Sequence, residues 1–113
     1  MKFCVTTPIY YINGEPHIGH AYASTAADIL ARFKRLDGYE VHFSTGTDEH
    51  GIKVARSAEK AQMKVQAFSD VMSQRFRDMS SLMKISYDDF IRTTEERHVK
   101  ASNLSWYAES LKK

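Results

Sequence analysis

The chain has 113 residues, which is enough for one domain, or part of one, with a single modest hydrophobic core. Its content of 42% apolar and 12% aromatic residues is typical of globular proteins and excludes an intrinsically disordered tail. Sixteen basic and 14 acidic residues leave a net charge of +2, which is too small to indicate a nucleic-acid partner from charge alone.

The first predicted element is a buried strand from Lys2 to Thr7, where β-branched and aromatic residues lead into Pro8. It contains Cys4, the only cysteine, which excludes an internal disulfide framework and a multi-cysteine zinc knuckle, so no metal site is predicted. The residues after Met1 show no secretory cleavage pattern, and no stretch reaches the ~20 apolar residues of a membrane span. We therefore expect a cytoplasmic protein with no membrane partner.

A turn and a long helix are predicted next. Asn13-Gly14 is a strong turn dipeptide in the loop from Tyr10 to Pro16. Beyond it, apolar residues recur at spacings of three and four and predict an amphipathic helix that ends at Gly38. The predicted buried face consists of Ile18, Tyr22, Ala26, Ile29, Phe33 and Leu36. The face expected to turn toward water consists of Ser24, Asp28, Arg32 and Arg35.

A second strand completes a βαβ unit. Residues 39–45 alternate apolar and polar side chains, and strand, helix and strand in this order predict two parallel strands. Residues 46–51 form the loop at the carboxyl end of the second strand. The sequence thus predicts an α/β fold with a parallel sheet, in which ligands bind at the carboxyl ends of the strands.

The remaining chain is predicted to be mostly helical. Residues 52–62 favour one helix, and a second apolar stripe favours another, whose methionines are expected to pack in the core rather than line an adaptable groove. Residues 88–92 are a short extended candidate, and residues 93–96 offer a Thr-x-x-Glu capping box for a last helix toward Lys113. The second stripe is Val65, Phe68, Met72, Phe76, Met79 and Met83.

The candidate chemistry begins with two histidines at the start of the long helix. His17 and His20 lie three residues apart at a helix N-terminus, where backbone amides and the helix dipole favour a phosphate group. Gly19, between them, leaves room for a flat ring such as adenine to lie against the backbone. Spacing alone leaves two alternatives open, a metal-binding pair and ordinary surface histidines.

Three ordered blocks then resemble the class I methionyl-tRNA synthetases. The first is residues 6–22, TTPIYYINGEPHIGHAY, with the signature His17-Ile18-Gly19-His20. The second is residues 45–51, TGTDEHG, and the third is residues 89–94, DFIRTT. The resemblance implies that the chain is the N-terminal part of a Rossmann-like nucleotide-binding domain, which activates methionine with ATP and Mg²⁺ and passes it to tRNA(Met).

The resemblance also implies roles for single residues. His17 and His20 would hold the ATP phosphates and stabilise the charge that develops in the transition state, and Gly19 would lie against the adenine. Asp48 would bind the ammonium group of methionine, with a helix N-cap as its alternative role. Ile9 and Tyr11 would line the pocket for the methionine side chain, where an apolar wall and an aromatic face suit a thioether.

Other parts of the family pattern are not found in residues 1–113. The lysine-rich second signature, the zinc-bearing connective insertion, the second half of the nucleotide-binding fold and the anticodon-binding domain have no counterpart in this sequence. We therefore expect residues 1–113 to form the N-terminal half of a catalytic domain and to be inactive alone. Two alternatives remain at this point, a non-catalytic nucleotide-binding or interaction module derived from a synthetase and a small nucleotidyltransferase.

Overall fold

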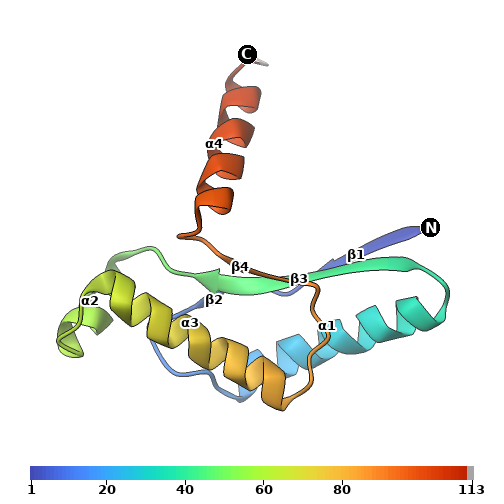
Figure 1. The fold of residues 1–113 in the computed structure, drawn as a ribbon, viewed down its shortest axis with the longest axis horizontal. Helices are drawn as coiled ribbons and strands as arrows, with labels where there is room; N and C mark the ends of the chain where they lie inside the picture. Colours follow the sequence, from blue (N-terminus) through green and yellow to red (C-terminus); the bar gives the residue numbers. More distant parts are fainter. Residues whose placement is uncertain (112–113) are drawn as a thin grey trace.

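The computed structural model describes residues 1–111 as one parallel sheet with three helices beneath it and a fourth helix that projects away (Figure 1). The elements in chain order are β1 (Lys2–Thr6), β2 (Tyr10–Tyr11), α1 (Ile18–Leu36), β3 (Glu40–Asp48), α2 (Ile52–Lys60), α3 (Val65–Leu82), β4 (Asp89–Arg92) and α4 (Glu96–Ser110). The predicted α/β class is confirmed, and so is the extended segment near residue 90. The two-residue strand β2 was not predicted, because it lies inside the loop that follows Pro8.

β3 is the central strand, and every strand that pairs with it runs parallel to it. β1 pairs along its first half, from Lys2 opposite Glu40 to Thr6 opposite Ser44. β2 pairs near its carboxyl end, where Tyr11 lies opposite Asp48. β4 pairs with residues 44–47, and β2 and β4 lie on opposite sides of β3. The carboxyl ends of three parallel strands therefore meet at one edge, next to the N-termini of α1 and α2.

α1, α2 and α3 cover the same face of the sheet (Figure 1). The larger core cluster joins α2 and α3 to β2 and β4. The middle of the predicted second stripe points inward, with Phe68, Met72 and Phe76 buried, but the prediction is wrong for its two ends, Val65 and Met83, which are exposed. A smaller cluster joins α1 to β3 through Ala27, Ala31 and Phe43. Within residues 1–111, no helix combines the length and apolar composition that a membrane span requires.

The orientation predicted for α1 is wrong, although its extent is confirmed. Its buried residues are Ala21, Ser24, Ala27, Asp28 and Ala31. Five of the six residues expected in the core are large side chains, and all five are exposed. Small side chains on the inner face let α1 lie close to the sheet, and Gly38 follows the helix with a φ of +85°, as a C-terminal glycine does.

Hydrogen bonds explain why two polar residues replace apolar ones on the inner face of α1. The Asp28 carboxylate accepts hydrogen bonds from the backbone N–H of Ser86 at 2.7 Å and from Arg32 at 2.7 Å, which ties α1 to the segment before β4. Burial opposes ionisation of Asp28, but the hydrogen bonds from Ser86 and Arg32 outweigh it and hold its pKa below the usual range. Ser24 shares a 2.9 Å hydrogen bond with the hydroxyl of Tyr10.

The capping box predicted for the last helix is not formed. α4 begins at Glu96 with Glu95 as its N-cap, and Glu95 makes no side-chain capping bond. The hydroxyls of Thr93 and Thr94 bind elsewhere, to Asp48 and Glu49 respectively. None of the residues of α4 is buried, and the helix extends away from the sheet on the side opposite the other three helices (Figure 1).

Candidate functional site

The two histidines of the first signature block form a reciprocal cap at the N-terminus of α1. His17 is the N-cap residue, and its Nδ1 accepts a hydrogen bond from the backbone N–H of Gly19 at 3.0 Å. His20 returns the contact, since its Nδ1 accepts a hydrogen bond from the backbone N–H of His17 at 3.0 Å. The ring centroids lie 3.8 Å apart. The structure therefore brings the two imidazoles together, as the spacing predicted.

This cap determines which ring nitrogens remain available. A neutral imidazole has one N–H donor and one acceptor, and in both rings the acceptor, Nδ1, is occupied by a backbone N–H. The proton of each neutral ring therefore resides on Nε2. Burial, and secondarily the charge of His17, lower the pKa of His20 below its ordinary value of 6.5. Near neutral pH, His20 presents a neutral Nε2–H donor.

Aromatic neighbours fix the ring of His20 from two sides. Tyr10 lies 4.8 Å from it and Phe76 lies 5.0 Å from it, both edge to face by ring centroids. The Tyr10 hydroxyl donates to the backbone oxygen of His20 at 3.3 Å. The two aromatic side chains come from β2 and α3. The sequence places Tyr10 in the loop before the histidines, but it does not predict the contact between Tyr10 and His20.

A steric contact, which the sequence did not indicate, explains why residue 19 is a glycine. A Cβ at this position would lie 2.9 Å from Cε1 and 3.0 Å from Nδ1 of His17. Any larger residue would therefore push the His17 ring out of its capping position. This reason concerns the histidine pair alone and leaves the expected contact with adenine a prediction.

Asp48 lies at the carboxyl end of β3 with one free oxygen. Its Oδ1 accepts hydrogen bonds from the backbone N–H of His50 at 3.2 Å and from the Thr93 hydroxyl at 3.4 Å. Among residues 1–111, no group hydrogen-bonds Oδ2, and no cation pairs with this carboxylate. The alternative role as a helix N-cap is wrong, because Gly51 is the N-cap of α2.

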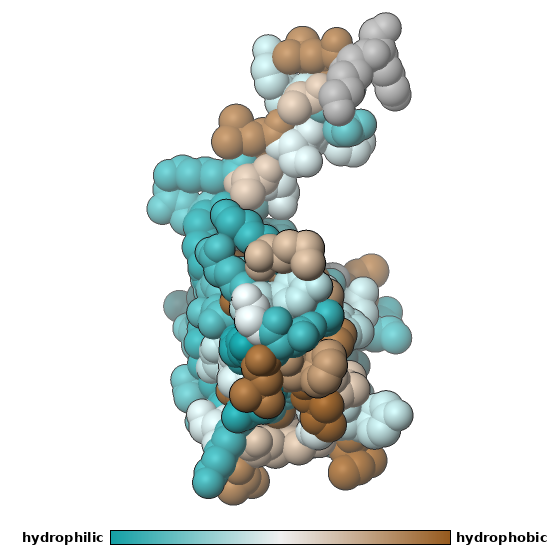
Figure 2. All heavy atoms as spheres, turned by 90° about the vertical axis from the view of Figure 1, so that its right-hand side faces the viewer, coloured by the Kyte–Doolittle hydropathy of each residue, from teal (hydrophilic) through white to brown (hydrophobic). Residues whose placement is uncertain are grey.

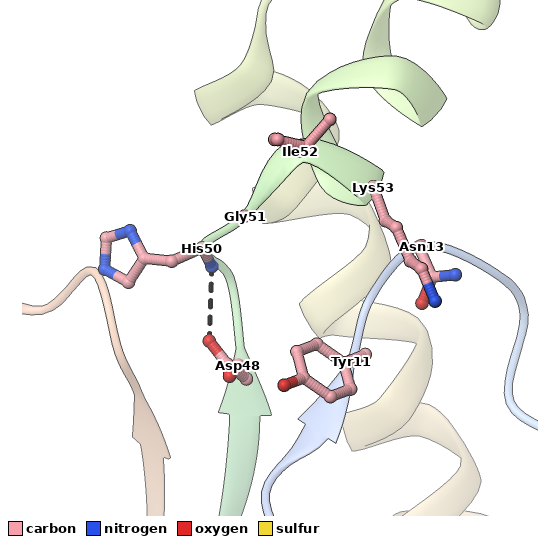
Figure 3. A pocket seen from close by; sticks show the side chains of 7 residues that line it. All are labelled: Tyr11, Asn13, Asp48, His50, Gly51, Ile52 and Lys53. Carbon is pink, nitrogen blue, oxygen red and sulfur yellow. Dashed lines mark hydrogen bonds between the residues drawn. The ribbon is translucent and has the colours of Figure 1, made fainter.

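Two adjoining cavities open at this edge of the sheet. One, of about 580 Å³, is lined by Asp48 and by the start of α2, and the ring of Tyr11 lies beside the carboxylate there (Figure 3). His50 also lines this cavity, although its ring is turned away from Tyr11 (Figure 3). The other, of about 480 Å³, is lined by Ile9, His17 and His20. Tyr11 and Asn13 line both, so these two residues form the boundary between the cavities.

The site residues predicted from the sequence therefore fall into two groups at one edge. The histidine pair offers N–H donors at a helix N-terminus, which suit an anion, and Asp48 offers an unpaired carboxylate, which suits a cation. Asn13 and Lys53 were not predicted, and both line the Asp48 cavity. The sequence could have indicated both, because Asn13 belongs to the predicted turn and Lys53 closely follows the second block, and both side chains are polar. The described residues hold no group of three metal-binding side chains.

Comparisons with known proteins agree with this arrangement. The sequence model of the family described as tRNA synthetases class I (M) matches residues 3–111. The methionine–tRNA ligase of Rickettsia bellii is 58% identical over 104 residues, which cover 92% of this chain and 20% of that protein. The ligase of Thermotoga maritima is 54% identical over 100 residues, which cover 88% of this chain and 16% of that protein.

A solved structure shows the same fold. The crystal structure of Mycobacterium tuberculosis methionyl-tRNA synthetase bound by methionyl-adenylate has a TM-score of 0.95 and 48% identity, over 98% of this chain and 22% of that one. This likeness confirms the expected Rossmann-like fold of a class I synthetase catalytic domain. The chain spans about a fifth of the length of these relatives.

Proposed function

The chain belongs to the class I tRNA synthetase family of the methionine type, and on that basis we propose that it is the N-terminal part of the catalytic domain of a methionine–tRNA ligase. One observation carries this proposal beyond family membership. An anion-binding pair of histidines and an unpaired carboxylate line adjoining cavities at the carboxyl ends of parallel strands. Methionyl-adenylate, which one relative binds, joins a phosphate to an amino acid that carries an ammonium group.

The reaction needs no protein nucleophile. A carboxylate oxygen of methionine attacks the α-phosphorus of ATP, the bond to the β-phosphate oxygen breaks, and pyrophosphate leaves with that electron pair. The methionyl group then passes to the terminal ribose of tRNA(Met), and AMP is released. Such a reaction depends on positioning and on donors that stabilise developing negative charge.

The residues of this chain take distinct parts in that scheme. The Nε2–H groups of His17 and His20 donate to the phosphate oxygens as negative charge develops, and Asp48 Oδ2 accepts from the ammonium group. Ile9 and Tyr11 contact the methionine side chain. Gly19 keeps the His17 ring in place and lies against the adenine.

ATP would bring Mg²⁺ with it, held by its phosphates. We assign no zinc site to this chain, because Cys4 is its only cysteine. We place the enzyme in the cytoplasm, where tRNA is charged.

Methionine-dependent exchange between ATP and pyrophosphate tests the proposal. We would use this chain alone and a full-length protein in which it replaces the matching segment of the Rickettsia bellii relative, called here the segment-swapped protein. We expect exchange only from the segment-swapped protein, and His20→Ala should slow it by roughly 100-fold. A folded segment-swapped protein without methionine-dependent exchange, or one that prefers another amino acid, would refute the proposal.

The same assay separates the alternatives. A non-catalytic module derived from a synthetase would support no exchange in either protein, although it could still bind ATP. A small nucleotidyltransferase would be complete in itself, and that interpretation does not fit a chain that belongs to a tRNA synthetase family and spans about a fifth of its relatives.

A further inference from the structure

The positive charge of this chain is concentrated on α2 and the residues that follow it. Residues 53–64 contain four cations and one carboxylate, so this segment carries a charge of +3, whereas the whole chain carries only +2. Lys53, Arg56 and Lys60 of α2 are exposed, and so is Lys64, the N-cap of α3. The rest of the chain is therefore slightly negative, and the excess of positive charge belongs to this segment.

Three of these cations share one face of the helix. With about 100° per residue, Lys53, Arg56 and Lys60 lie within about 60° of one another around the axis of α2 and span about 10 Å along it. The buried residues of α2, Val54 and Ala58, lie on the other side of the helix. We call Lys53, Arg56 and Lys60 the basic face of α2.

No carboxylate within residues 1–111 pairs with the basic face of α2. Every other arginine in this part of the chain pairs with a carboxylate, except Arg77, which lies over the ring of Phe90. Arg56 does neither. Glu59, the only acidic residue of α2, pairs with none of the three cations. The charges of the basic face are thus left for an anionic partner outside the described residues.

The basic face of α2 begins at the cavity that Asp48 lines. Lys53, at the start of α2, lines the same cavity (Figure 3). α2 lies at the end of the molecule toward which the strands point (Figure 1). The opposite end has a different surface, where apolar side chains gather on the lower part of the body (Figure 2). A row of cations therefore leads away from the cavity in which the ammonium group of methionine is proposed to bind.

A nucleic-acid strand is the partner whose chemistry fits this row. Its phosphates form a regular series of negative charges, and lysine and arginine side chains neutralise them without reading the bases. Transfer of the methionyl group brings the terminal ribose of tRNA(Met) to the Asp48 cavity. The nucleotides that precede this ribose then leave through the mouth of the cavity, where Lys53 lies.

We propose that the basic face of α2 binds the backbone phosphates at the 3′ end of tRNA(Met) and guides the terminal ribose into the Asp48 cavity. This inference rests on the proposed function, because the partner is the tRNA of that enzyme. Contact with the remaining polypeptide of the enzyme is the competing interpretation. It would make the basic face a structural surface and would leave tRNA binding independent of its charges.

Arg56→Gln with Lys60→Gln in the segment-swapped protein tests the proposal. Lys53 stays unchanged because it lines the cavity. Binding of tRNA(Met) is titrated by fluorescence over a range of salt concentrations. We expect Kd to rise roughly tenfold at low salt, and the slope of log Kd against log salt to fall by about 1.4, because each lost phosphate contact removes about 0.7. Methionine-dependent pyrophosphate exchange uses no tRNA and should be unchanged.

A shortened RNA and a control variant locate the contact. The variant and the unsubstituted segment-swapped protein should bind tRNA(Met) without its single-stranded 3′ end equally, because the phosphates that the two side chains neutralise are then absent. Lys2→Gln with Lys84→Gln removes the same total charge from exposed positions outside α2. This control should leave the Kd for intact tRNA(Met) unchanged.

Each outcome decides the question. An unchanged Kd in the α2 variant, a rise that the control variant matches, or an equal rise with the shortened RNA would overturn the proposal. So would a lower unfolding midpoint with tRNA affinity preserved, because the remaining polypeptide would then be the partner. A segment-swapped protein without exchange whose tRNA binding responds as expected would contradict the proposed function alone. An active one whose tRNA binding does not respond would contradict this inference alone.

Discussion

Arg92 of β4 grips the carboxylate of Glu49 with two nitrogens: Nε donates to Oε2 at 2.7 Å and to Oε1 at 3.1 Å, and Nη2 donates to Oε1 at 2.8 Å. Glu49 is 2% exposed. The hydroxyls of Thr47 and Thr94 also donate to it, each at 2.9 Å. Because a buried carboxylate is costly unless its oxygens are satisfied, these donors together hold the loop after β3 against the end of β4.

Removing this carboxylate should destabilise the fold. Glu49→Ala leaves two hydroxyls without their carboxylate acceptor and leaves the guanidinium of Arg92 with Asp70 alone, so we expect a loss of roughly 3 kcal/mol in the free energy of unfolding. Urea denaturation followed by circular dichroism measures it. Lys100→Met removes the exposed pair with Glu96 on α4 and should change the same quantity by less than about 0.5 kcal/mol. Equal losses in the two variants would show that the Glu49 network does not stabilise the fold.

The same network reaches Asp48 through Thr93. The backbone N–H of Glu49 donates to the Thr93 hydroxyl at 2.9 Å, and that hydroxyl donates to Asp48 Oδ1. We therefore predict that Thr93 is a positioning residue, which holds the carboxylate of Asp48 at the cavity that this carboxylate lines.

Loss of this hydroxyl should affect methionine more than ATP. In the segment-swapped protein, Thr93→Val should raise the KM for methionine by roughly fivefold, the value of one hydrogen bond, and should change kcat little. Thr93→Ser retains a hydroxyl and should restore most of the affinity. Steady-state pyrophosphate exchange at varied methionine measures both constants. A fall in kcat alone, or equal effects of valine and serine, would contradict the positioning role.

The contrast between Thr93 and Phe76 explains what the sequence predicted and what it did not. The stripe with Phe76 was assigned correctly because a helix that packs against a sheet buries its large apolar side chains in most folds. Thr93 was read as a helix cap because a Thr-x-x-Glu pattern is local, whereas its actual partners lie 44 and 45 residues away in the chain. Long-range hydrogen bonds leave no periodic signal in one sequence.

The prediction of the orientation of α1 was wrong for a different reason. The apolar stripe of α1 exists, but the helix packs against the sheet through small residues. Its inner face also includes Asp28, which binds Ser86, a residue 58 positions further along the chain. Periodicity identifies the apolar face of a helix without identifying what covers it. For the site, the histidine pair and Asp48 followed from motifs, whereas the Glu49 network depended on the pairing of β3 with β4.

A glycine inside β3 makes a further prediction about that pairing. A Cβ on Gly46 would lie 1.9 Å from the backbone oxygen of Ile91 in β4. Backbone cannot move away as a flexible side chain would, so Gly46→Ala should cost at least about 2 kcal/mol of stability. Gly14→Ala is the matched control, since a Cβ there meets nothing within 4 Å. Thermal denaturation of the two variants compares them, and a Gly46→Ala protein as stable as the Gly14→Ala protein would contradict this close approach of the strands.

The lowered pKa of His20 predicts how stability depends on pH. The folded protein binds a proton at His20 less readily than the unfolded chain does, so the unfolded state holds more protons as pH falls below the ordinary value of 6.5. The contribution of His20 to stability is therefore complete above pH 6.5 and is lost as pH falls from there toward the lower, folded-state pKa. Asp28, Asp70 and Asp89 also have lowered pKa values, but their ordinary value is 3.8, so their contributions are lost at lower pH.

His20→Gln isolates this effect from the other histidines. Glutamine at the third helical position accepts the same backbone hydrogen bond in ordinary capping boxes, so the variant should keep the cap and lose the titration. We expect the urea midpoint of the native chain to fall more between pH 7.5 and pH 5.5 than that of His20→Gln. Since the other four histidines are present in both proteins, the difference between the two slopes belongs to His20 and to its charge coupling with His17. Identical slopes would mean that protonation of His20 does not oppose folding, and that the neutral Nε2–H donor inferred for phosphate binding is not favoured by its surroundings.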